Sequence, residues 1–111
     1  MEINRKEEGN ITLLELIGNL DTNTAPAAEK AVNEVIDLGV DKLLFDLSNT
    51  GFVSSAGLRV FLVATKKLSA KGGSVKLCAP NDVVKEILEI SGFTTIIDVR
   101  SSVEQGIDEL K

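Results

Sequence analysis

A short apolar run that leads through a polar turn into a second apolar run is the feature that most constrains this fold. The run Leu43–Leu47 is bounded by polar residues, as is typical of a strand buried on both faces. After the turn, Ser54 and Ser55 open a stretch whose apolar residues recur with helical spacing to about residue 70. A buried strand followed by a helix of this kind predicts a central sheet strand in an α/β fold.

Strand and helix patterns alternate along the rest of the chain. The predicted elements are strands over 2–7 and 11–17, a helix that begins after Thr24 and ends at Gly39, a strand over 43–47, a helix over 54–70, a strand over 74–79, a helix capped by Asn81, a short strand over 95–99 and a helix that begins at Ser101 or Ser102. The first two strands are expected to form a hairpin. This order predicts one α/β domain over residues 1–111, with a mixed sheet of four to five strands, 43–47 central, and helices packed mainly on one face.

The helix over 54–70 carries apolar residues on two sides. At about 100° per residue, one stripe is predicted to face the core: Leu58, Phe61, Leu62, Thr65 and Leu68. Val60 and Val63 then fall on roughly the opposite side, where we expect a partner-binding patch, because clustered apolar surface often marks an interface. Single exposed valines are also common without any function. In the helix after Asn81, the residues predicted to face inward are Val83, Val84, Ile87 and Leu88.

The composition argues against several classes of function. The chain has no histidine, one cysteine and a net charge of −5. Because His is the commonest general base and a lone Cys cannot build a structural zinc site, we expect neither an enzyme nor a metal or other cofactor. Acidic and basic residues are interspersed, so no basic patch predicts nucleic-acid binding.

The same sequence predicts a cytoplasmic protein that does not enter a membrane. No apolar run approaches the roughly 20 residues of a membrane span, and the segment Met1–Glu7 lacks the apolar centre of a signal peptide. Cys78 has no partner for an internal disulfide and is expected to be a small core residue. A reducing compartment fits this cysteine usage.

The serine pair is the strongest candidate for a chemical switch. A serine in the first turn of a helix lies near unpaired backbone N–H groups and the positive end of the helix dipole. A phosphate there would be stabilised, and it would change the local charge by about −1.5 to −2. The alternative is that Ser54 serves only as the N-cap.

Polar residues that follow two of the strands are expected near these serines. Ligand sites of open α/β sheets lie beyond the carboxyl ends of the strands, which predicts that Asp21, Asn49 and Ser55 meet at one edge. Asp21 has an alternative role in the turn before the first helix, because Asp readily bonds nearby backbone N–H groups.

The segment Phe52–Leu58 resembles the signature of the STAS domain, as found in bacterial anti-sigma factor antagonists. The usual form is an aromatic residue, an apolar residue, Asp, Ser, then Ser, Thr or Ala, and then Gly-Leu. The resemblance extends over essentially the whole chain, with further matches at Gly18–Asp21, Asp46, Lys71–Gly73 and Ile90–Phe93. Ser54 departs from the pattern, because it stands where the family usually carries Asp; Ser can replace the cap but not the charge.

The resemblance implies a STAS-like sandwich and a regulatory function. Similar proteins capture an anti-sigma factor that is also a serine kinase, free the sigma factor for transcription, and release the kinase once the signature serine, here Ser55, is phosphorylated. A separate phosphatase restores capture, and the antagonist is a monomer or weak dimer. The alternatives are a STAS scaffold module of a stress-sensing assembly, or an accessory STAS domain in small-ligand or lipid transport. The residues expected to bind the partner are Asp21, Thr24, Asn49, Ser54, Ser55, Gly57, Leu58, Val60 and Val63.

Overall fold

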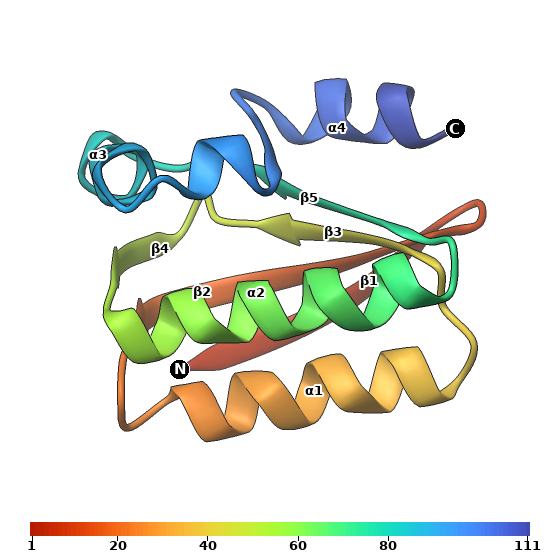
Figure 1. The fold of residues 1–111 in the computed structure, drawn as a ribbon, viewed down its shortest axis with the longest axis horizontal. Helices are drawn as coiled ribbons and strands as arrows, with labels where there is room; N and C mark the ends of the chain where they lie inside the picture. The colour runs from red at the N-terminus through yellow and green to blue at the C-terminus, as the bar shows by residue number, and fades with distance from the viewer.

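The computed structural model describes residues 1–111 and shows a mixed α/β sheet, which confirms the predicted class. In chain order the elements are β1 (Glu2–Glu8), β2 (Ile11–Leu20), α1 (Ala25–Asp37), β3 (Lys42–Asp46), β4 (Thr50–Val53), α2 (Ser55–Ala70), β5 (Ser74–Cys78), α3 (Asp82–Ile90), a single 3₁₀ turn (Phe93–Thr95), β6 (Asp98–Arg100) and α4 (Val103–Leu110). Figure 1 shows how these elements are arranged.

The sheet has the strand order β1-β2-β3-β5-β6, with β4 paired to β2. β1 and β2 form the predicted antiparallel hairpin, and every other pairing is parallel. β3 lies between β2 and β5, and its Leu44 and Phe45 are both 0% exposed. The prediction of a central, doubly buried strand is therefore confirmed.

The sheet has six strands, where four to five were predicted. The additional strand is β4, which occupies a segment where the sequence indicates only a polar turn. β4 pairs with the last residues of β2, from Gly18 to Leu20, so that β2 extends beyond its predicted end at residue 17. β3 pairs with the first half of β2, and the two strands therefore follow one another along the same side of it. β6 begins at Asp98, because the 3₁₀ turn takes up the start of the predicted strand.

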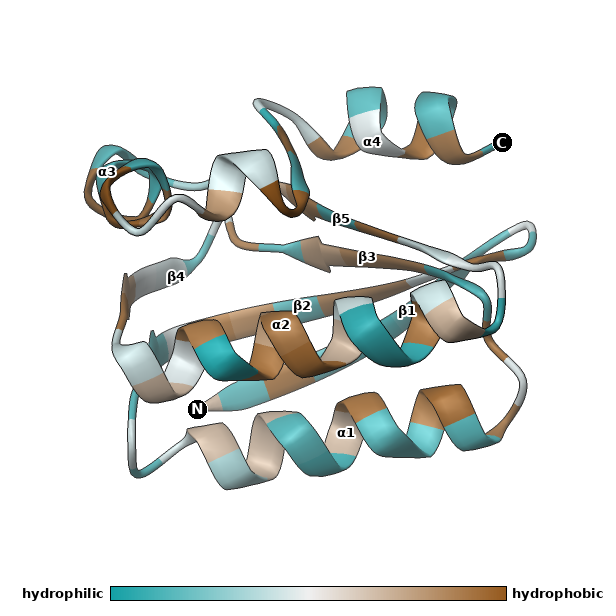
Figure 2. Ribbon diagram, viewed as in Figure 1, coloured by the Kyte–Doolittle hydropathy of each residue, from teal (hydrophilic) through white to brown (hydrophobic).

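The helices lie mainly on one face of the sheet, as predicted. α1 and α2 run side by side across that face, whereas α4 lies on the opposite one (Figure 1). The main core consists of 22 buried residues, which come from one side of the strands, from the inner sides of α1, α2 and α3, and from the connecting segments. Figure 2 shows apolar residues along the strands and on the helix sides that meet them. A second cluster of five residues joins α4 to the sheet: Ile11, Leu13, Leu44 and Cys78 from the strands, with Leu110 from α4.

α2 is anchored on the central strand by an aromatic pair. The rings of Phe45 in β3 and Phe61 in α2 are 5.0 Å apart in an edge-to-face arrangement, which is a favourable geometry for such rings. The residues of α2 that are buried are Gly57, Val60, Phe61, Ala64 and Leu68.

The expectation that Val60 lies opposite the core face is therefore wrong. Val60 is 3% exposed and belongs to the main core, whereas Val63, Leu58 and Leu62 are only partly buried. The helix is rotated from the predicted orientation by somewhat less than one residue step of about 100°. The small residues Gly57 and Ala64 are buried on the side that faces the sheet, and at Gly57 there is no space even for a Cβ atom.

Two further expectations differ in detail. Val83 is 54% exposed, whereas Val84 and Leu88 are 0% exposed, because α3 packs against β4 and the 3₁₀ turn with only one side. Thr24 occupies the N-cap position of α1, but its side chain does not cap the helix. By contrast, Asn81 accepts from the N–H of Val84 at 2.8 Å, as its predicted capping role requires.

α4 is attached to the sheet by the small apolar cluster and by ion pairs of Glu109. Lys76, which is only 6% exposed, lies 3.1 Å from carboxylate oxygens of both Asp98 and Glu109. Arg100 also bonds Glu109, at 2.7 Å. Hydrogen bonds from Lys76 and Arg100 hold the pKa of Glu109 below its ordinary value. Burial raises the pKa of the Cys78 thiol to about 11, which leaves it protonated and unreactive at neutral pH.

Truncating the two valines of α2 tests the observed orientation of the helix. Val60→Ala is expected to lower the free energy of unfolding by about 1–3 kcal/mol, because it leaves a cavity in the core. Val63→Ala, at a partly buried position of the same helix, is expected to cost less than about 1 kcal/mol. Urea unfolding curves measure both values, and equal costs for the two variants would contradict the burial of Val60.

Candidate functional site

The start of α2 is held firmly against the end of β2. The N–H of Ser54 donates to the carbonyl oxygen of Leu20 at 2.9 Å. The side chain of Ser54 caps the helix, and its Oγ accepts from the N–H of Gly57 at 3.4 Å. Ser55 is the first residue of α2 and is exposed, and its hydroxyl makes no hydrogen bond within the protein. The two serines therefore differ: one hydroxyl is engaged and the other is free.

Gly57 has a structural role that explains why no side chain is present there. A Cβ atom at this position would lie 2.6 Å from the carbonyl oxygen of Leu20 and 2.9 Å from a methyl carbon of Val53. The absence of a side chain thus allows the first turn of α2 to approach the sheet. Gly57 is buried and cannot contact a partner with a side chain, so its place among the predicted partner-binding residues is not supported.

The turn between β2 and α1 is stabilised by the side chains of Asp21 and Thr24. Oδ1 of Asp21 accepts from the N–H groups of Asn23 and Thr24. The hydroxyl of Thr24 donates to the carbonyl oxygen of Asn19 at 2.7 Å and accepts from the N–H of Asp21 at 2.9 Å. Because Leu20 bonds to Ser54, this turn is next to the start of α2.

Asn49 does not join these residues. Its side-chain amide donates to Oε2 of Glu15 at 3.1 Å. Glu15 alternates with Leu14 and Leu16, which belong to the main core, so its side chain lies on the face of the sheet opposite to α2. Asn49 therefore does not join Asp21 and Ser55 as predicted. Asp21 directly follows Leu20, which bonds to Ser54, but its carboxylate bonds N–H groups of its own turn.

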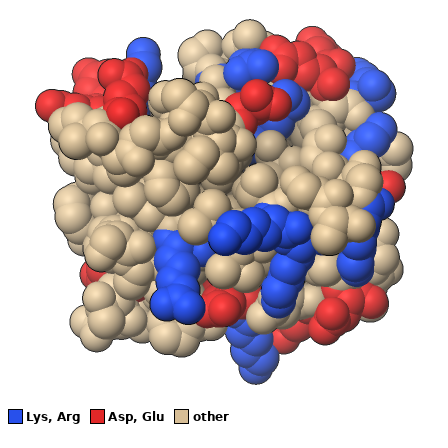
Figure 3. All heavy atoms as spheres, in the orientation of Figure 1, with Lys and Arg blue, Asp and Glu red and all other residues tan.

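Ser55 opens onto a groove between the first turns of α1 and α2. The groove has a volume of about 410 Å³ and is lined by Thr22, Ala25, Pro26, Glu29, Ser55, Ala56 and Arg59. Lys and Arg side chains gather over α2 on this face, with acidic side chains beside them over α1 (Figure 3). The predicted site residues included neither Glu29 nor Arg59. The spacing of Ser55 and Arg59, four residues apart on one helix, is the sequence signal that could have identified the arginine.

A family model described as the STAS domain matches residues 2–106. The chain belongs to the STAS domain family. BtrV of Bordetella bronchiseptica is 36% identical over 96 residues, which cover 86% of this chain and 83% of BtrV. The anti-sigma-B factor antagonist of Bacillus subtilis is 26% identical, over 96% of this chain and 97% of that protein. The solved structure of the Bacillus cell fate determinant SpoIIAA in its phosphorylated form has a TM-score of 0.76 at 18% identity, over 99% of this chain and 100% of SpoIIAA.

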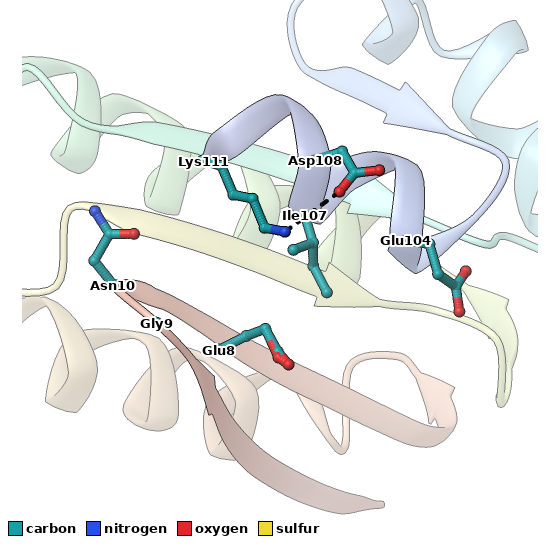
Figure 4. Close-up of a pocket in the computed structure, with 7 residues that line it drawn as sticks. All are labelled: Glu8, Gly9, Asn10, Glu104, Ile107, Asp108 and Lys111. Atoms are coloured by element: carbon teal, nitrogen blue, oxygen red, sulfur yellow. Dashed lines mark ion pairs between the residues drawn. The ribbon is translucent and has the colours of Figure 1, made fainter.

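A second hollow of this STAS domain is more acidic than the serine groove. It has a volume of about 380 Å³ and lies between the β1–β2 turn and α4 (Figure 4). Its lining carries three carboxylates, and its one cation, Lys111, is 3.6 Å from Asp108. No three His, Cys, Asp or Glu side chains are grouped so that they could hold a metal ion. None of the helices combines the length and apolar character that a membrane span needs.

The serine groove of the STAS domain offers a hydroxyl that another enzyme could modify, without the groups that would make this serine a nucleophile. Glu29 and Arg59 are the only ionisable side chains in its lining, and neither forms a hydrogen bond to the Ser55 hydroxyl. A serine nucleophile needs an adjacent base that is itself oriented by a third group. The groove lacks that arrangement, whereas an exposed, unbonded hydroxyl is accessible to a modifying enzyme.

Substitutions at Ser54 test its role as the cap. Ser54→Ala is expected to lower the free energy of unfolding by about 0.5–1 kcal/mol. Ser54→Asp keeps an acceptor and adds a negative charge at the positive end of the helix, so it is expected to stabilise the domain by about 0.3–1 kcal/mol at low salt. Thermal unfolding at two salt concentrations measures both effects, since the gain from Asp is screened as salt rises. A stability of the Asp variant below that of the Ala variant would contradict the capping geometry.

Proposed function

We propose that this STAS domain is an anti-sigma factor antagonist that is switched by phosphorylation. In its unphosphorylated form it binds an anti-sigma factor that is also a serine kinase, and the bound kinase releases its sigma factor. Phosphorylation of Ser55 ends the capture, and a phosphatase that acts on Ser55 restores it. The phosphoryl chemistry belongs to these partners, and the STAS domain is their substrate and ligand.

The observation that carries the proposal is the free hydroxyl of Ser55 at the start of a firmly held helix. The neighbouring Ser54 is engaged as the cap, which leaves Ser55 as the serine that can reach the γ-phosphate of ATP bound to a kinase. The names of the relatives support the same function, because the Bacillus subtilis protein is an antagonist of an anti-sigma factor. The solved phosphorylated form of SpoIIAA supports a modified state of this fold.

Phosphorylation is expected to change the surface and leave the fold intact. A phosphate on Ser55 is stabilised by the N-terminal N–H groups of α2. The net charge of −5 falls to roughly −7. A partner that fits closely over the groove must then bury a negative charge for which it has no oppositely charged group, which costs about 3–5 kcal/mol of binding free energy. A penalty of that size lowers affinity by a factor of more than about 100.

The surface that contacts the partner is proposed to surround Ser55. Of the residues predicted from the sequence, Asp21, Thr24, Leu58 and Val63 retain some exposure and remain candidates, together with Ser54. Val60 is excluded from this surface by its burial in the core.

Variants at Ser55 test the switch. Ser55→Ala is expected to bind the kinase constitutively, because the acceptor hydroxyl is lost while the interface stays intact. Ser55→Glu is expected to bind at least about 10-fold more weakly while remaining folded, since its single charge mimics only part of a phosphate. Calorimetric titration with the cognate kinase measures the affinities, and far-UV circular dichroism checks the fold. Ser69→Ala, on the exposed part of the same helix, is the matched control.

The site of modification is tested separately. After incubation with the cognate kinase and ATP, peptide mass spectrometry is expected to find one phosphate, on Ser55. Phosphate on Ser54, or on neither serine, would show that the assignment is wrong. A pull-down from the native host distinguishes the alternatives: recovery of a transporter subunit or of a large assembly of STAS proteins, in place of the kinase, would contradict the proposed function.

A further inference from the structure

The serine groove contains one cation, and that cation has no partner. The chain has three arginines, and two of them are paired with carboxylates: Arg5 lies 2.8 Å from Glu7, and Arg100 lies 2.7 Å from Glu109. Arg59 lies within ion-pair distance of no carboxylate, although Glu29 lines the same groove. Its guanidinium therefore keeps all five N–H donors available for a ligand.

The position of Arg59 on α2 directs its side chain toward Ser55. Residues four apart on a helix are neighbours on its surface, with Cβ atoms about 5–6 Å apart. Helical side chains also lean toward the N-terminus of their helix, so a long side chain at position 59 covers the preceding turn, where Ser55 lies. Both residues line the groove, which confirms that they share one face of the helix.

We propose that Arg59 binds the phosphate group carried by Ser55 and holds it in the groove between the first turns of α1 and α2. This inference rests on the proposed phosphorylation of Ser55 and adds the residue that receives the product. The planar fork of Arg matches two phosphate oxygens at once, whereas Lys offers only a point charge. Glu29 lines the same groove and repels a phosphate there, and the positive charge of Arg59 offsets that repulsion.

The other cations of α2 are not placed to take this role. Lys67 donates to the side-chain oxygen of Asn33 at 2.6 Å. Lys66 is exposed, but it lies eleven residues beyond Ser55, which is about 16 Å along the helix axis. Lys66→Gln therefore removes the same formal charge from the same helix without touching the groove, and it is the matched control for Arg59→Gln.

The test measures the second pKa of the phosphate by ³¹P NMR. Phosphoserine is incorporated at position 55 during synthesis of the full chain, so no kinase is needed. The second pKa of the phosphate is expected to lie below its ordinary value of about 6, because the guanidinium favours the dianion. Arg59→Gln is expected to raise it by about half a unit or more. Arg59→Lys is expected to restore part of the difference, Lys66→Gln to leave the value unchanged, and Glu29→Gln to lower it further.

Two results would overturn the inference. One is that the second pKa of the phosphate is the same in Arg59→Gln as in the parent chain. The other is that Lys66→Gln raises this pKa as much as Arg59→Gln does, which would show that the pKa responds to the total charge of the helix and not to Arg59. Arg59 is exposed, so each variant is expected to fold. Failure of a kinase to modify Ser55 would contradict the proposed function but would leave these titrations interpretable. Conversely, if Arg59→Gln leaves the second pKa of the phosphate unchanged, Arg59 is not the phosphate ligand, and the proposed switch at Ser55 is unaffected.

Discussion

The contact between the end of β2 and the start of α2 is the constraint on which the rest of the site depends. The hydrogen bond from Ser54 to Leu20 fixes the backbone where the strand ends and the helix begins. Gly57 allows the helix to lie so close that no side chain would fit between it and the sheet. One turn further on, Phe61 meets Phe45 of the central strand. The first turns of α2 are thus supported at successive points by the sheet.

A helix start that is held in this way suits the proposed switch, which works through charge. The phosphate proposed for Ser55 would be added to a helix whose position is already fixed by its contacts with the sheet, so little of the structure would need to rearrange. The proposed modification would change the electrostatic character of one groove, in which Arg59 and Glu29 carry opposite charges. Such a switch costs little folding free energy in either state, because the modified residue is exposed and the core beneath it is unaltered.

The sequence predicted elements that depend on local pattern and missed those that depend on tertiary contacts. The central strand was identifiable because Leu43–Leu47 is apolar and bounded by polar residues. β4 was not identifiable from the sequence, because its four residues include a glycine and form a strand only through pairing with the end of β2. The inner face of α2 was misjudged at Val60, since apolar periodicity gives weight to large side chains and none to Gly57 or Ala64.

The same limit applies to the site. The serine pair was recognisable from its position before an apolar helix, and the engagement of Ser54 as the cap follows from local chemistry. The groove could not be foreseen, because it requires α1 to lie beside α2. Asn49 was misplaced for a related reason: β4 separates it from the serines, and its amide bonds Glu15 on the other side of the sheet.

The attachment of α4 has a consequence for how the domain opens under native conditions. The other three helices share one core of 22 buried residues, whereas α4 contributes to a cluster of five and is joined to the sheet by the ion pairs of Glu109 with Lys76 and Arg100. Regions with few buried apolar contacts unfold locally at a lower free energy than the whole domain. The backbone amides of α4 are therefore expected to exchange with solvent hydrogen through detachment of this helix alone, while β3 and α2 exchange only when the entire domain unfolds.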